Sequence, residues 1–170
     1  MLAAMIVFRL FHVICGVLWV GGMVLLVAFI LPAVRASGPS GGQVMRNLLV
    51  QTRLASYFPS IGGLTVLSGF AMMWRDSAIS QDNWAASGPG IAYSIGGLAG
   101  LIALIVGGTM IGRSVNQIRV LALASDPDAP PSPEQAARIA QLQARADLGN
   151  RIVLPLLIIA VITMAVARYL

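Results

Sequence analysis

The chain has 170 residues, of which 58% are hydrophobic and only 10% are charged. A soluble domain averages about 45–50% apolar and about 25% charged residues. The composition therefore excludes an ordinary soluble enzyme, a disordered chain and a disulfide-rich scaffold. The net charge of +5 comes from arginines that flank apolar segments, as membrane orientation signals do, so we expect no nucleic-acid partner. We predict one small integral membrane domain over residues 1–170.

Four apolar stretches are long enough, or nearly so, to cross a bilayer, which takes about 20 residues. They cover residues 10–34, 57–74, 90–112 and 152–167, and each is followed by an arginine. The sequence therefore predicts an all-α, four-helix integral membrane bundle in contact with the lipid bilayer.

The arginines in the connections predict the orientation of these spans, because positive residues collect on the cytoplasmic side. Eight arginines lie in the connections after the first and third spans, against three on the opposite side. Both termini and the loop 75–89 are then expected outside. Both long connections are expected in the cytoplasm.

The two long connections also carry helix signals. The breaker-rich stretch 37–42 precedes a predicted helix over 43–56, and a turn is expected over 126–131. Ser132–Gln135 predicts a helix start, with serine at the N-cap, proline first and glutamine third. We therefore expect the third and fourth helices to extend into the cytoplasm as a paired stalk over about 113–151.

Small residues line single faces of the predicted second and third helices. Such faces let helix backbones approach closely in lipid, so we interpret them as packing within the chain, with a dimer face as the alternative. The residues concerned are Gly96, Gly100, Ala103 and Gly107, the pair Gly108 and Gly112, and in the second span Ser60, Gly63, Ser68 and Gly69.

His12 is, apart from the thiol of Cys15, the only ionisable side chain within the four spans. Ionisable groups inside lipid are costly and therefore informative. His12, Cys15, Gly16 and Trp19 recur at helical spacing and share one face. The chain carries no hydrolytic triad, zinc-protease motif, paired-cysteine motif or phosphate loop. His12 is thus either a metal or haem ligand or a hydrogen-bonded packing residue.

Soft sulfur side chains are expected at the same membrane depth as His12. Met72 and Met73 end the second span on the outer side, and Met164 lies near the same end of the fourth. Histidine, cysteine and methionine suit Cu(I), and histidine or methionine also ligates haem iron. His12, Cys15, Met72 and Met164 are therefore candidate metal ligands, although methionine and cysteine also serve as apolar core residues.

The first span carries a pattern that resembles a known family. Phe11-His12, followed by Trp19-Val20-Gly21-Gly22 and Ile30–Arg35, resembles the first helix of copper-resistance D type membrane proteins and of related four-helix integral membrane proteins. The same His-x6-Trp-x-Gly-Gly spacing is similar to the membrane half of cytochrome-linked urate oxidases.

The resemblance implies a protein of the bacterial inner (cytoplasmic) membrane that serves copper handling, haem b binding or electron transfer near the outer face. His12, Trp19, Gly21 and Gly22 carry over from the motif. The expected membrane depth of the methionines makes Met72, Met73 or Met164 the candidate second cofactor ligand. Because the chain has a single histidine, bis-histidine haem within one chain is excluded. A His/Met haem, a His-only haem and a site shared across a homodimer stay open.

Two other classes of function fit the same sequence. The glycine-lined faces, the arginine-rich stalk and the lack of catalytic groups also suit a non-catalytic accessory or assembly subunit of a larger membrane complex. A stripe of Ser60, Thr65 and Ser68 in the second span would suit a small transporter or channel, which would require oligomerisation.

Overall fold

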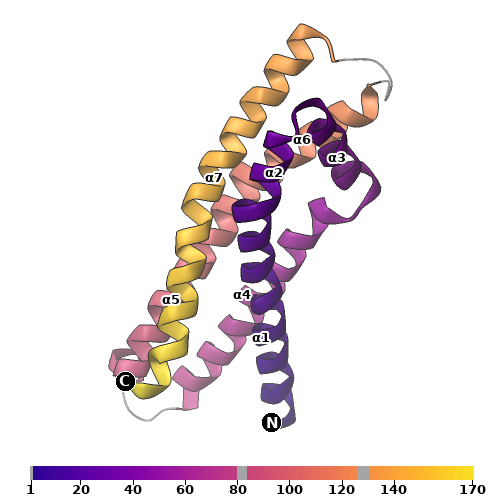
Figure 1. Ribbon diagram of the computed structural model, residues 1–170. Helices are drawn as coiled ribbons and strands as arrows, with labels where there is room; N and C mark the ends of the chain where they lie inside the picture. The colour runs from indigo at the N-terminus through magenta and orange to yellow at the C-terminus, as the bar shows by residue number, and fades with distance from the viewer. Residues whose placement is uncertain (1, 80–83, 126–130) are drawn as a thin grey trace.

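The computed structural model describes residues 2–79, 84–125 and 131–170, which are almost entirely helical and contain no strand (Figure 1). Two long rods change helix type without breaking, since α1 continues through η1 into α2, and α5 continues through η3 into α6. The elements in chain order are α1 (Leu2–Leu25), π-helical η1 (Leu26–Ile30), α2 (Leu31–Ala36), α3 (Gly38–Gln51), α4 (Leu54–Ile79), η2 (Trp84–Ala86), α5 (Gly88–Val106), π-helical η3 (Gly107–Gly112), α6 (Arg113–Ala124), α7 (Pro133–Val166) and η4 (Ala167–Tyr169).

Four helices in the described part of the chain are long and apolar enough to cross a membrane. They are Ala3–Ala36, Leu54–Ile79, Gly88–Ala124 and Pro133–Tyr169, and each contains one predicted span. Large apolar side chains such as Val17 and Leu67 are exposed on their outer faces. Lipid covers such faces at no hydrophobic cost. The predicted all-α membrane-protein architecture is confirmed.

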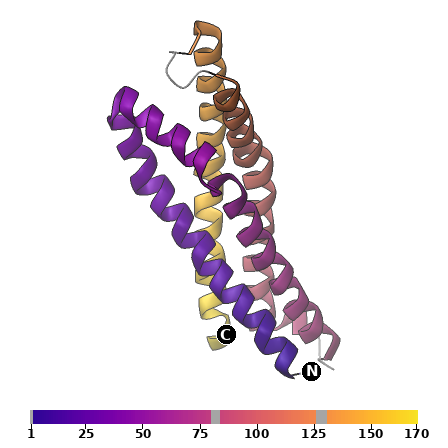
Figure 2. The same cartoon turned by 90° about the vertical axis from the view of Figure 1, so that its right-hand side faces the viewer.

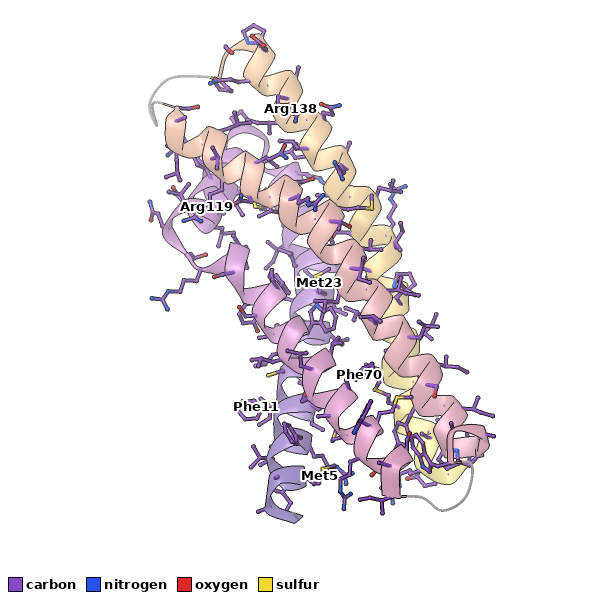
Figure 3. The ribbon with its side chains drawn as sticks, turned by 180° about the vertical axis from the view of Figure 1, so that it is seen from behind. Met5, Phe11, Met23, Phe70, Arg119 and Arg138 are labelled. Atoms are coloured by element: carbon purple, nitrogen blue, oxygen red, sulfur yellow. The ribbon has the colours of Figure 1, made fainter. Side chains whose placement is uncertain are left out.

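The four long helices form two antiparallel pairs, α1 with α4 and α5 with α7 (Figures 1 and 2). Both termini lie at one end of the bundle, and α3 lies at the other end beside α6. Figure 3 places Phe11 near the terminal end and Arg119 and Arg138 near the opposite end. The molecule therefore has two chemically different ends, one carrying the His12 region and one carrying the arginine-rich stalk.

The stalk is the part of the fold that local sequence signals predicted best. Ser132 accepts a hydrogen bond from the Gln135 backbone while the Gln135 side chain accepts one from Ser132, a capping box that starts α7. Arg138 then donates to Gln117 of α6, and Leu142 is buried between the two helices. The predicted turn over 126–131 lies, except for Pro131, outside the described residues.

The expected break over residues 37–42 is present but shorter than predicted, because α3 begins at Gly38 and contains most of that stretch. The chain turns at Ser37, and Gly38 follows with a φ of +55°, a conformation that glycine adopts at little cost. A side chain at Gly41 would collide with the Val34 carbonyl, so this glycine lets α3 fold back against α2. The predicted helix over 43–56 is also wrong in extent, since the extended backbone of Thr52 ends α3.

The predicted small-residue face of the third span is only partly used within the chain. Ala103 is fully buried, and a side chain at Gly96 would meet Thr163 and Met164 of α7. At Gly100, by contrast, an added Cβ would meet no atom within 4 Å among the described residues. Packing within the chain therefore accounts for Gly96 and Ala103 and leaves Gly100 open.

Candidate functional site

Side chains of one helix fill glycine gaps of the other along the contact between α1 and α4, which we call the α1–α4 seam. Contacts between a side chain and a glycine bring two helix backbones close together without leaving a cavity. The contacts repeat at successive turns with an antiparallel register and join His12 to Gly69, Gly16 to Thr65, Trp19 to Gly62 and Gly22 to Phe58.

His12 is held in the α1–α4 seam by one hydrogen bond and one close backbone contact. Its Nδ1 lies 2.8 Å from the Thr65 carbonyl oxygen, and a Cβ added at Gly69 would lie 2.7 Å from its Cε1. A carbonyl oxygen can only accept, so Nδ1 carries the proton. In the neutral ring Nε2 is then the atom with the free lone pair, an arrangement typical of metal-ligating histidines.

The hydroxyl stripe of α4 does not present a polar lining. Thr65 donates to the Ile61 carbonyl at 2.7 Å, and Ser68 donates to the Leu64 carbonyl one turn earlier. Hydroxyls that bond back to their own helix are satisfied without water. The part of the stripe that is buried therefore offers no free polar path across the bundle.

The sulfur side chains divide between the two helix pairs. Cys15 is buried beside Trp19 and Met23 on α1. Met72 and Met73, both partly buried, follow Gly69 by three and four residues on α4, so helical spacing places Met72 on the face that holds Thr65 and Gly69. Three of the predicted metal ligands, those at positions 12, 15 and 72, thus belong to the α1–α4 pair.

Met164 belongs to the other pair, because its side chain lies at the position where a Cβ on Gly96 would be. It therefore packs between α5 and α7, as a gap-filling methionine does. Among the described residues, no group of three or more histidine, cysteine, aspartate and glutamate side chains is placed to hold a metal ion. Any metal bound here would depend on His12 together with sulfur ligands.

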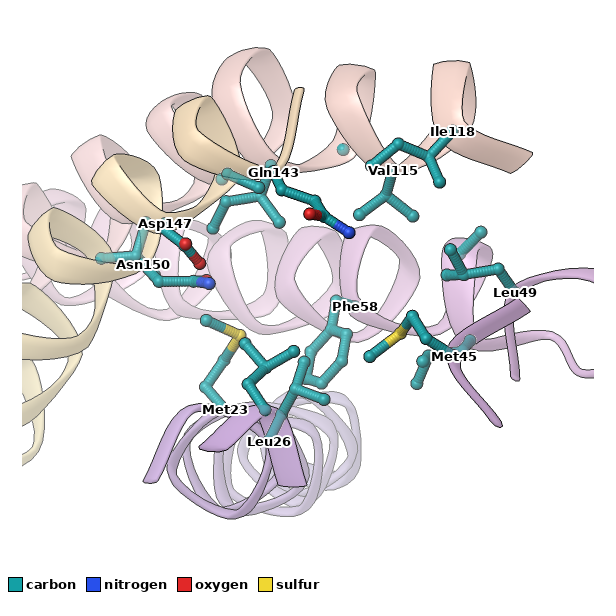
Figure 4. A pocket seen from close by; sticks show the side chains of 18 of the residues that line it. Met23, Leu26, Met45, Leu49, Phe58, Val115, Ile118, Gln143, Asp147 and Asn150 are labelled. Carbon is teal, nitrogen blue, oxygen red and sulfur yellow. The ribbon is translucent and has the colours of Figure 1, made fainter. Parts of the chain in front are cut away.

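A second feature, which sequence reasoning missed, is a cavity of about 380 Å³ on the stalk side of Trp19 (Figure 4). We call it the stalk-side cavity. Its walls come from α1, η1, α2, α3, α4, α5, η3, α6 and α7, and Met23, Phe58 and Met45 point into it. Trp19 separates the two regions, since it contacts Gly62 in the α1–α4 seam and also lines the cavity.

Polar groups gather at one side of the stalk-side cavity. Asn150 is only 6% exposed, and its amide points into the space beside Met23. Gln143 lies two turns away on α7 and also points inward. Arg35 donates to Asp147 at the rim, so the two rim charges neutralise each other.

Asn150 is the buried polar residue whose side chain faces the cavity, whereas Ser114 Oγ and Arg119 Nε are buried without a partner among the described residues but do not line it. No hydrogen bond to its side chain is found within residues 2–79, 84–125 and 131–170. An amide buried without a partner costs roughly 1–3 kcal/mol. The sequence did contain a signal for it, because Ile139, Leu142 and Ala146 follow helical spacing and the same spacing reaches Asn150 one turn later.

Both π-helical segments border the stalk-side cavity. In η1 the Leu31 N–H bonds to the Leu26 carbonyl, one residue further back than in an α-helix. In η3 the Arg113 N–H bonds in the same way to Gly108. Leu26 and Gly108 both line the cavity, and π segments occur frequently at functional sites.

Comparison with protein-family models, with curated proteins and with solved structures gives no match to this chain. The resemblance of the first helix to copper-resistance D proteins therefore stays a prediction. The function has to be argued from the α1–α4 seam and the stalk-side cavity themselves.

Proposed function

We propose that this integral membrane protein binds a single Cu(I) ion through Nε2 of His12. The observation that supports the proposal is the hydrogen bond between Nδ1 of His12 and the Thr65 carbonyl, which orients the ring and makes Nε2 the ligating nitrogen of its neutral form. Cys15 and Met72 belong to the same helix pair and would supply soft sulfur ligands. The bound ion would be held for handling or transfer, which is the role that the first-helix resemblance implies.

Haem b is the second cofactor that the first-helix motif implies, and the local packing favours it less. The His12 ring lies against Gly69, and the residues that line the stalk-side cavity do not include His12. A porphyrin needs a broad apolar slot beside its ligating imidazole, whereas a two- or three-coordinate ion needs only the ligand atoms. A haem would therefore have to lie on the outer surface of the pair or between two copies.

The membrane setting of the site follows from the arginine distribution. We place both termini and the His12 end on the outer side of a bacterial cytoplasmic membrane, with the stalk in the cytoplasm. Reporter enzymes fused after Leu170 test this placement. A reporter active only outside should work at that position, and a reporter active only inside should work when inserted between α6 and α7.

Association with a second copy, or with a larger complex, is a separate proposal carried by open glycines on α5. Added Cβ atoms at Gly97 and Gly100 would meet no atom within 4 Å among the described residues. Helix faces of this kind pair closely in lipid. Leucine at Gly100 should lower the dimer fraction of the detergent-purified protein, measured by light scattering.

The metal proposal is tested by anaerobic Cu(I) competition against a chromogenic chelator, with copper and iron measured on the same sample. We expect about one copper per chain for the native protein, and a loss of binding of at least tenfold for His12→Ala. Phe11→Ala is the matched control, because Phe11 is adjacent but exposed. Helicity and elution volume report whether each variant folds.

Other outcomes of that experiment are equally decisive. A Soret band in the visible spectrum that is lost in His12→Ala would replace copper by haem at the same residue. Full copper binding by a folded His12→Ala variant would overturn the proposal. A colourless protein that takes up no Cu(I) would also overturn it and leave His12 as a packing residue.

A further inference from the structure

We propose that the stalk-side cavity binds an uncharged, single-chain amphiphile drawn from the surrounding lipid leaflet. The polar head would hydrogen-bond to Asn150, and the apolar chain would run toward Trp19. The proposal is independent of the metal site, because none of the cavity residues belongs to the proposed metal ligands.

The first argument is the buried amide of Asn150. This side chain is more than nine-tenths buried, points into the cavity and has no partner among the described residues (Figure 4). Buried polar groups in native proteins nearly always have a partner. A ligand with a hydroxyl or carbonyl head supplies the missing hydrogen bond.

The second argument is the match between the cavity and the depth profile of a bilayer. Asp147 and Asn150 precede the predicted fourth span, at the level where lipid head groups lie. Met23, Leu104 and Trp19 lie deeper within their spans and line the opposite part of the cavity. A ligand with its head at Asn150 and its chain at Trp19 is therefore oriented like the neighbouring lipids.

The third argument concerns charge. Arg35 and Asp147, the two charged residues on the cavity wall, are paired with each other. A carboxylate or phosphate head would have to compete with Asp147 for Arg35, and a cationic head would have to compete with Arg35 for Asp147. An uncharged head leaves the pair intact.

The size of the cavity limits the ligand to one chain. Pockets for small organic ligands measure roughly 300–1,000 Å³, and the volume of about 380 Å³ is near the lower limit. A monoacylglycerol fits this description, with two hydroxyls, an ester carbonyl and one acyl chain. A two-chain phospholipid is too large to enter fully.

The test uses Trp19 as the reporter, since it lines the cavity. In a Trp74→Phe, Trp84→Phe background Trp19 is the sole tryptophan. The full chain in detergent is titrated with 9,10-dibromostearoyl glycerol, whose bromines quench tryptophan on contact. Dibromostearate and a dibrominated phosphatidylcholine at equal bromine concentration serve as the charged and the two-chain probes.

We expect saturable quenching of Trp19 by the monoacylglycerol and weaker, non-saturating quenching by both other probes. Asn150→Leu should raise the half-saturation concentration roughly tenfold, which is the size of one buried hydrogen bond. Gly108→Leu fills the cavity from η3 and should abolish saturable quenching. Gly63→Leu is the matched control, because that glycine also has open space around it but does not line the cavity.

Three results would overturn the proposal. Saturable quenching that persists in folded Gly108→Leu places the probe outside the cavity. Unchanged half-saturation in Asn150→Leu removes the polar head contact. Tighter saturable quenching by dibromostearate than by the monoacylglycerol contradicts the neutral head.

Discussion

The two halves of the first long helix, formed by α1, η1 and α2, pack differently against the rest of the molecule. Between His12 and Gly22 side chains of α1 and α4 fill glycine gaps on the facing helix, and Nδ1 of His12 has a backbone partner on α4. From Met23 onward the first helix borders the stalk-side cavity, where the Asn150 side chain has no partner within the described chain.

This difference separates a region that is packed for stability from a region whose cavity is suited to binding a ligand. Selection for stability favours close packing in which the buried polar groups are hydrogen-bonded. A cavity with an orphan amide costs free energy, and proteins retain such features mainly where they serve binding. The α1–α4 seam should therefore lose stability on substitution, whereas the stalk-side cavity should gain it.

The largest effect is expected at the boundary between the two regions. Trp19→Ala removes a side chain that is only 5% exposed and joins the cavity to the seam. We expect a loss of about 3 kcal/mol in the free energy of unfolding, measured by SDS titration. Trp74→Ala, at a position 73% exposed, should change it by less than about 0.5 kcal/mol. Equal effects at both positions would contradict the boundary role of Trp19.

The next effect tests how tightly the α1–α4 seam is packed. Gly69→Ala places a methyl group 2.7 Å from the His12 ring, so ring or helix must shift. Overpacking of this kind costs about 2 kcal/mol, and the hydrogen bond to Thr65 should weaken with it. Gly63→Ala, where the added methyl meets nothing within 4 Å of the described residues, should instead be neutral or slightly stabilising. A Gly69→Ala protein as stable as the native one would show that the α1–α4 seam can accommodate an extra methyl group and is not tightly packed.

The sequence predicted the elements of this fold because their signals are local. The helical spacing of His12, Cys15, Gly16 and Trp19 predicted that the four share one face, and His12, Gly16 and Trp19 do contact α4. Ser132 and Gln135 marked the start of α7 because a capping box involves only four consecutive residues. Both signals depend on geometry within one helix.

The rest required the relation between helices, which no local pattern contains. The partner of His12 is a backbone carbonyl, and an acceptor present at every residue leaves no signature in the side chains. The start of α3 was mispredicted because glycine and proline are tolerated in a first helical turn. The cavity depends on how far η1 stands from η3, so neither the open space nor the role of Asn150 in its wall was predicted.

A substitution in the stalk-side cavity is expected to act with the opposite sign. Asn150→Leu removes an amide that loses contact with water on folding and gains no hydrogen bond in return. Leucine is of similar size. After exhaustive removal of bound lipid we expect the free energy of unfolding to rise by about 1 kcal/mol. Asn116→Leu, at an exposed position of α6, should change it little. A destabilised Asn150→Leu protein would mean that the amide has a partner inside the bundle.

The smallest effect concerns the ion pair at the cavity rim. The side chains of Arg35 and Asp147 are 59% and 35% exposed, so water screens their attraction. A double-mutant cycle with Arg35→Gln and Asp147→Asn should give a coupling energy below about 1 kcal/mol, falling further as salt is added. A coupling of several kcal/mol that ignores salt would place the pair in a dry environment. In that case the rim would be closed to the lipid leaflet. Asn150 would then face an isolated void and not a site that a lipid-like ligand can enter. The two halves of the first long helix would then differ only in how densely they are packed.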